Sequence, residues 1–89
     1  MVRIMDTSRT MDEDRELQMM AADPELVVSV EFGRMLYHAF IGDKRRGYRA
    51  KKEMPSFDAA VRWLRSQARR FYPRSKYVRE LGRRVVFTA

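Results

Sequence analysis

Two prolines, Pro55 and Pro73, delimit the segment whose pattern most strongly constrains how this chain folds. Between them, apolar residues recur at helical spacing and fall within about 100° of arc on a helical wheel. These residues are Phe57, Ala60, Val61, Leu64, Ala68 and Phe71. Ser56 is a favourable N-cap, Asp58 lies in the first turn where the helix dipole favours an acid, and Pro73 stops the helix. The pattern predicts one amphipathic helix that packs on a core through this apolar stripe.

Two segments with strand character, residues 26–32 and 35–41, precede this helix. Both are rich in β-branched and aromatic residues, and Gly33-Arg34 between them suits a type II′ turn with glycine first. One face of the resulting hairpin is apolar and consists of Val28, Val30, Phe32, Met35, Tyr37, Ala39 and Ile41. The opposite face is mixed and includes the single histidine, His38. The two segments therefore predict an antiparallel hairpin that supplies one face of the core.

A third strand is predicted over residues 48–54, whose side chains alternate, with Arg49 and Lys51 on its outer face. The loop that precedes it, residues 42–47, has a basic tip. That tip consists of Lys44, Arg45 and Arg46. Together the segments predict an α+β fold, an antiparallel sheet of three to five strands with one main helix packed on one face, with room for a short N-terminal helix.

The C-terminal segment, residues 77–88, fits two structures. A second tight hairpin with Gly82-Arg83 in the turn is favoured, because residues 80–85 echo residues 31–36 of the first hairpin. The alternative is a short helix capped by Ser75, followed by an edge strand near the C-terminus. We expect the hairpin, which would raise the number of strands from three to five.

Charge divides the chain into two parts. Residues 1–25 hold seven acids and three arginines, a net charge of −4, whereas residues 26–89 hold sixteen basic and five acidic residues, a net charge of +11. Residues 1–10 have no periodicity and are expected to be disordered, and residues 11–22 can form a short helix that ends at Asp23-Pro24. We therefore expect an acidic N-terminal arm over residues 1–25 beside a single basic α+β domain over residues 26–89, with the arm able to compete for the basic surface.

Several classes of protein are excluded or disfavoured by what the sequence lacks. Without cysteine, the chain cannot form disulfides, use thiol catalysis or bind zinc through sulfur. No apolar run approaches the roughly 20 residues of a spanning helix and no signal peptide is visible, so a cytoplasmic protein is expected. His38 is expected to pack or hydrogen-bond within its strand, and no phosphate-binding glycine loop or metal-ligand spacing occurs. We expect no catalytic residue, no cofactor and no metal site.

Basic residues form the strongest functional signal. Three groups, in the loop, on the third strand and along one flank of the helix, are expected to converge on one surface. They are Lys44, Arg45, Arg46, Arg49, Lys51, Arg62, Arg65 and Arg69. Arginine outnumbers lysine, which suits bidentate contact with phosphate or carboxylate. The expected partner is a nucleic acid, DNA rather than RNA, or an acidic protein or nucleoprotein surface, and no membrane.

The stretch from Phe32 to Tyr72 resembles the arm-binding domains of phage and transposon integrases. The resemblance is carried by the order of strand, strand, basic turn, strand and helix. Its motifs are Gly42-Asp-Lys-Arg-Arg-Gly47, Tyr48-Arg-Ala-Lys-Lys52, Ser56-Phe-Asp-Ala-Ala60 and Trp63-Leu64. The resemblance implies three antiparallel strands followed by a helix, with the sheet laid in the major groove. It also implies that Arg49 and Lys51 face the groove and that the basic turn touches phosphate.

In size and layout the chain is also similar to small phage-encoded inhibitors, among them anti-CRISPR and host-polymerase-binding proteins. Two functions are therefore expected from the sequence. The first is a small non-enzymatic accessory or regulatory protein of a phage or mobile element that binds nucleic acid. The alternative is a phage-encoded inhibitor that docks on an acidic face of its target.

Overall fold

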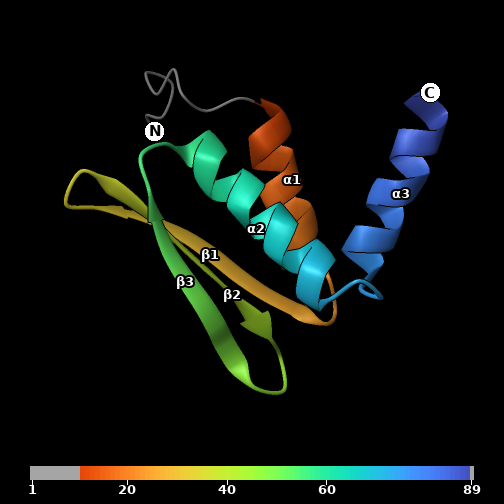
Figure 1. Cartoon of the computed structure of the whole chain (residues 1–89), viewed down its shortest axis with the longest axis horizontal. Coiled ribbons are helices and arrows are strands. Elements are labelled where there is room, and N and C mark those ends of the chain that lie inside the picture. The colour runs from red at the N-terminus through yellow and green to blue at the C-terminus, as the bar shows by residue number, and fades with distance from the viewer. Residues whose placement is uncertain (1–10, 89) are drawn as a thin grey trace.

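Three antiparallel strands form one sheet, and the helices lie on one side of it (Figure 1). The computed structural model describes residues 11–88, and side chains over residues 12–82. The elements in chain order are α1 (Met11–Ala22), β1 (Leu26–Gly33), β2 (Leu36–Asp43), β3 (Gly47–Met54), α2 (Phe57–Phe71) and α3 (Lys76–Thr88). This arrangement confirms the α+β class, with β2 at the centre of the sheet. The segment expected to be disordered, residues 1–10, lies outside the described residues.

The β1–β2 hairpin turns one residue later than expected. Arg34 and Met35 occupy the turn with φ values of 53° and 66°, the positive values that a type I′ turn requires at both positions. The expected type II′ turn at Gly33-Arg34 is therefore wrong. In the observed register Phe32 lies opposite Tyr37, and their rings pack at 4.8 Å between centroids. Moving the turn by one residue shifts the partner of each β1 residue by two positions along β2. Because side chains alternate with a period of two, the expected apolar face is preserved except for Met35, which lies in the turn and is 82% exposed.

The core lies between this apolar sheet face and α2. Ser56 caps the helix, since its hydroxyl accepts a hydrogen bond from the Ala59 amide at 3.1 Å. Side chains buried in the core are Met20, Leu26, Ala39, Ile41, Phe57, Ala60, Val61, Leu64, Ala68 and Tyr77. Five of the six residues of the expected helical stripe are among them, and the sixth, Phe71, is 58% exposed. Truncating a fully buried residue such as Leu64 to alanine would cost about 2–5 kcal/mol.

The short N-terminal helix is present and belongs to the same core. Met20 on α1 is fully buried, and α1 lies beside α2 (Figure 1). The buried carboxylate of Asp23 follows α1 and accepts hydrogen bonds from the amides of Glu25 and Tyr77, both at 2.7 Å. Residues 11–25 are therefore tied to both β1 and the start of α3.

The C-terminal hairpin is wrong, because residues 76–88 form one helix, α3. The Ser75 cap of the alternative interpretation is present, since its hydroxyl accepts a hydrogen bond from the Val78 amide at 3.4 Å. The helix then continues to Thr88, through the residues for which that interpretation expected an edge strand. The decisive contacts are remote in sequence. Tyr77 is 1% exposed and its amide is held by Asp23, which fixes the first turn in a helical conformation. Gly82 is consequently a helical residue and not part of a turn.

Candidate nucleic-acid interface

A three-residue loop between β2 and β3 presents the basic tip. Asp43 pairs with Gly47, and Gly47 has φ of 79°, as expected for a type I turn followed by a left-handed residue. One carboxylate oxygen of Asp43 accepts hydrogen bonds from the amides of Arg45 at 3.1 Å and Arg46 at 2.9 Å. The Lys44 amide donates to the Glu25 carbonyl at 3.0 Å. The backbone of the loop is therefore fixed, while all three basic side chains are exposed.

Asp43 joins this loop to the end of α2. Its second carboxylate oxygen accepts a hydrogen bond from the Tyr72 hydroxyl at 3.0 Å. Burial raises the pKa of Asp43, but the hydrogen bonds from Arg46, Tyr72 and Arg45 outweigh it and leave the pKa below its ordinary value. Burial, followed by the hydrogen bond to Asp43, raises the pKa of Tyr72. The carboxylate thus acts as an anchor, with its oxygens turned to protein donors.

A β-bulge separates Arg49 from Lys51. The pairing of β2 with β3 shifts between Ile41 and Gly42, which leaves Arg49 as an extra residue on β3. Arg49 lines a pocket on the helix-covered side of the sheet together with Arg46. Lys51 instead pairs with Phe40 on the open side, with its ammonium 6.0 Å from the ring centroid. The expectation that Arg49 and Lys51 share an outer face is therefore wrong.

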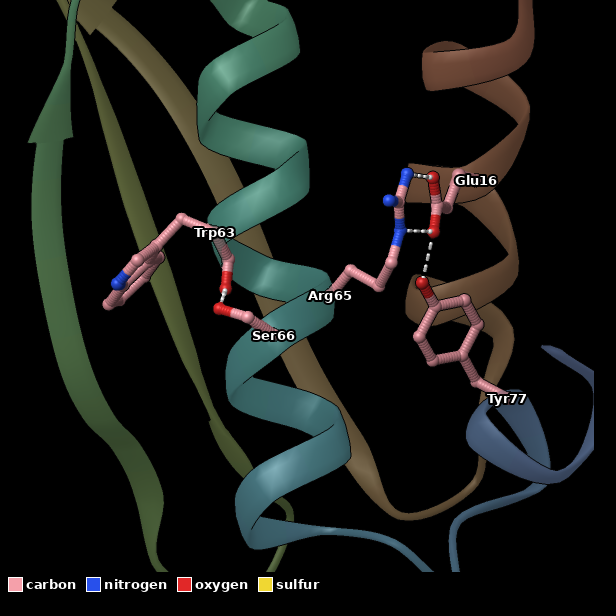
Figure 2. A network of polar contacts seen from close by, with 5 residues as sticks. All are labelled: Glu16, Trp63, Arg65, Ser66 and Tyr77. Carbon is pink, nitrogen blue, oxygen red and sulfur yellow. Dashed lines mark hydrogen bonds and ion pairs between the residues drawn. The ribbon is translucent and has the colours of Figure 1, made fainter. Parts of the chain in front are cut away.

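Arg65 is held in a buried network that joins three helices (Figure 2). Its Nε and Nη2 donate to the two carboxylate oxygens of Glu16, both at 2.7 Å. The Tyr77 hydroxyl donates to the same carboxylate. The hydrogen bond to Glu16 raises the pKa of Arg65, and burial followed by the bond to Glu16 raises the pKa of Tyr77. The Arg65 charge is therefore neutralised inside the protein and is not presented to a ligand.

Arg62 and Arg69 lie on the same side of α2 as Arg65, since they are three residues before it and four after it. Figure 2 shows Arg65 directed toward α1, whereas Trp63 points to the opposite side of α2. Both Arg62 and Arg69 are exposed, and neither lines the pockets beside the loop. Of the eight expected residues, the structure brings together those of the loop and Arg49. The others are placed on different surfaces.

Two aromatic residues that the sequence pattern did not assign to a site, Phe71 and Tyr72, complete it. Phe71 was expected in the core, yet its ring is exposed and lies 5.2 Å from the Arg70 guanidinium. Phe71, Tyr72 and Arg46 line two neighbouring pockets of about 380 and 350 Å³. The position of Phe71 in the last turn of α2, two residues before Pro73, is a local signal that it could leave the core. We call the basic loop, Arg49 and these two aromatic residues the loop site.

The remaining candidates for chemistry have structural contacts. His38 Nε2 donates to the Gly33 carbonyl at 2.9 Å, and its Nδ1 lies 3.4 Å from a carboxylate oxygen of Glu53. Among the residues that the structure describes, no group of three or more histidine and acidic side chains is arranged to hold a metal ion. Within the same part of the chain, none of the helices has the length and apolar character needed to cross a membrane.

Comparison of the chain with protein-family models, with curated proteins and with solved structures finds no match. The function is therefore argued from the loop site itself.

Proposed function

We propose that this chain is a small non-enzymatic protein that binds nucleic acid through the loop site. The observation that supports this most directly is the cluster of exposed cations on a fixed loop: Lys44, Arg45, Arg46 and Arg49. The salt bridges between described side chains, His38 with Glu53 and Arg65 with Glu16, involve none of these four. Against the effect of burial, Arg46 lowers the pKa of the adjacent Asp43, whose carboxylate already accepts three hydrogen bonds. Fixed cations of this kind suit phosphate oxygens, with which arginine makes bidentate contacts.

The charge around the site favours an extended anion over a single small one. Residues 26–89 carry a net charge of +11, which attracts a polyanion before contact is made. The loop projects at the end of the sheet where α2 also ends (Figure 1). The first turn of α1, which carries Asp12, Glu13 and Asp14, lies at the far end of the molecule from the loop (Figure 1), so a phosphate backbone could reach the loop without approaching these acids. An accessory or regulatory role in a phage or mobile element fits this small binding surface.

The dependence of affinity on salt tests how many cations take part. Each phosphate neutralised on duplex DNA contributes about −0.9 to the slope of log affinity against log salt concentration. Four contacts predict a loss of about 100-fold between roughly 50 and 200 mM salt, whereas eight contacts predict about 10⁴-fold. Fluorescence anisotropy with labelled DNA and RNA measures this slope directly. A slope near that of eight contacts would contradict the assignment of the site to the loop and Arg49.

Substitution of one loop cation locates the surface. Arg45→Ala is expected to reduce the salt slope by about one and to weaken binding to every sequence alike. Arg34→Asn is the matched control, because it also removes one exposed arginine but lies in the turn at the other end of β2. Equal losses for the two variants would mean that binding depends on net charge and not on the loop. Absence of binding at about 50 mM salt would refute the proposed function.

The alternative, an inhibitor that docks on an acidic protein face, has one observation in its favour. Phe32 and Met35 at the β1–β2 hairpin are 62% and 82% exposed, and nucleic acid binding at the loop gives them no role. A neighbouring pair of exposed apolar side chains is more typical of protein contact. Capture of a host protein after nuclease treatment, and loss of that capture in Phe32→Ala, would favour this second function.

A further inference from the structure

One of the two pockets of the loop site has the composition of a site for a flat aromatic ligand with a negative charge. It has a volume of about 350 Å³ and lies between β3 and the last two turns of α2. Its lining residues are Ile41, Arg46, Arg49, Ala50, Gln67, Phe71 and Tyr72. Ile41 is buried and Ala50 half-buried, Phe71 and Tyr72 contribute aromatic rings, and no acidic side chain lines it. We call it the aromatic pocket.

We propose that the aromatic pocket takes one unpaired base of a bound strand, so that the preferred ligand of this protein is single-stranded nucleic acid. This inference rests on the proposed function, because the phosphates are held by the loop cations. Arg46 lines both pockets of the loop site, which makes the loop and the aromatic pocket one continuous surface. A strand that follows the loop therefore passes the mouth of the pocket.

Exposure of Phe71 supports a stacking role. The residue has the right helical phase for the core, yet 58% of its surface remains accessible while the other members of the stripe are buried. An exposed ring beside guanidinium groups is what proteins use to stack unpaired bases, because any base offers a π-face. In a duplex the bases are already stacked on one another and cannot enter a pocket without being unpaired.

The two guanidinium groups at the pocket complete the complementarity. Arg46 and Arg49 lie on the pocket wall and both are exposed, so both can contact the phosphate attached to the base. Gln67 supplies an amide that can donate and accept, which matches the hydrogen-bonding edge of a base. The apolar floor, the ring, the amide and the charges together match a nucleotide and not a bare phosphate.

The test compares one strand with its duplex. Anisotropy is measured at constant salt with a labelled short oligonucleotide, alone and annealed to its complement, for wild type, Phe71→Ala and Phe71→Leu. We expect wild type to prefer the single strand, and both variants to lose about 5- to 100-fold on the single strand with little change on the duplex. Phe71→Leu keeps an apolar side chain without a ring, so an equal loss in both variants assigns the effect to stacking.

Phe32→Ala is the matched control, since it also removes an exposed phenylalanine but lies on β1, next to the β1–β2 turn at the opposite end of the hairpin from the loop. It should leave both affinities unchanged. Binding of strand and duplex with equal affinity, or wild-type affinity in Phe71→Leu, would overturn the base pocket while leaving the phosphate-binding loop in place. Absence of binding to either ligand by wild-type protein would overturn the proposed function as well.

Discussion

Removal of the Glu16 carboxylate is the perturbation that the structure predicts in most detail. Glu16 is 8% exposed and accepts two hydrogen bonds from Arg65 and one from the Tyr77 hydroxyl. Breaking a fully buried ion pair costs about 3–5 kcal/mol, because one charge is left without a partner. The Arg65 side chain is 31% exposed, so water can solvate part of the charge that remains. We therefore expect Glu16→Ala to lower the free energy of unfolding by about 2–3 kcal/mol.

A loss of this size is large for a small domain, whose total stability is of the order of 5–15 kcal/mol. Urea unfolding followed by circular dichroism and by the fluorescence of Trp63 measures it, with an expected fall in the midpoint of about 1–2 M. Glu31→Ala removes an exposed acid from β1 and is the control, with an expected change within about 0.5 kcal/mol. A double-mutant cycle with Arg65→Ala should give a coupling energy above about 1 kcal/mol. A coupling near zero would refute the view that this network holds the three helices together.

Three further predictions concern stability. Gly42→Ala should destabilise the fold by about 2–3 kcal/mol, because the added Cβ would lie 1.8 Å from the Gly47 carbonyl oxygen. Gly82→Ala should stabilise it by about 0.5–1 kcal/mol, because Gly82 is helical and an added Cβ would have no neighbouring atom within 4 Å. The midpoints of urea unfolding measure both effects. Met35→Gly should raise the thermal midpoint by about 2–8 °C, because φ of 66° strains a side chain and suits glycine. Burial and the hydrogen bond to Glu16 raise the pKa of Tyr77, so its contribution to stability is complete below about pH 10 and should be lost as the pH rises further. The loss should be smaller in Tyr77→Phe, and urea unfolding between about pH 8 and 11 measures it.

Each of these has a result that contradicts it. An unchanged midpoint in Gly42→Ala would mean that the bulge and the close approach of β3 are absent. Destabilisation by Met35→Gly would argue against the type I′ turn. Stability falls at alkaline pH because folded Tyr77 keeps a proton that the unfolded chain releases. An equal loss of stability in Tyr77→Phe would assign the effect to other titrating groups.

The local sequence pattern was sufficient to predict those helices and strands whose conformation is determined by their own residues. The apolar stripe between Pro55 and Pro73 predicted the helix α2 and five of its buried residues. The β-branched and aromatic content of residues 26–41 and the alternation of residues 48–54 predicted the three strands. The same reasoning failed over residues 77–88, where Gly82 suggested a turn. There the structure depends on contacts of Tyr77 with Asp23 and Glu16, which are more than fifty residues away in sequence. A local pattern carries no information on such contacts.

The loop site was predictable in part for the same reason. Adjacent cations between two strands remain adjacent in any hairpin, so Lys44, Arg45 and Arg46 are together as expected. The face to which Arg49 points depends on a single extra residue at the bulge, since one residue reverses the alternation of a strand. The exposure of Phe71 depends on how α2 sits on the sheet, which the helical pattern alone does not contain.

The acidic N-terminal segment, residues 11–25, packs against the rest of the fold instead of forming a separate arm beside the basic surface. It was expected to compete for the cations as an arm, and one of its acids, Glu16, does pair with a predicted site residue, Arg65. Met20 on the same helix is fully buried, however, so α1 cannot leave without exposing the core. We expect deletion of residues 1–23 to destabilise the protein, because it removes Met20 from the core and leaves Arg65 without Glu16. α1 pairs with Arg65 and removes that cation from the surface, whereas Arg62 and Arg69 stay exposed on the same side of α2. The three loop cations and Arg49 lie together beside a hydrogen-bonded loop backbone, so we expect the affinity to follow these four residues rather than the total charge of the chain.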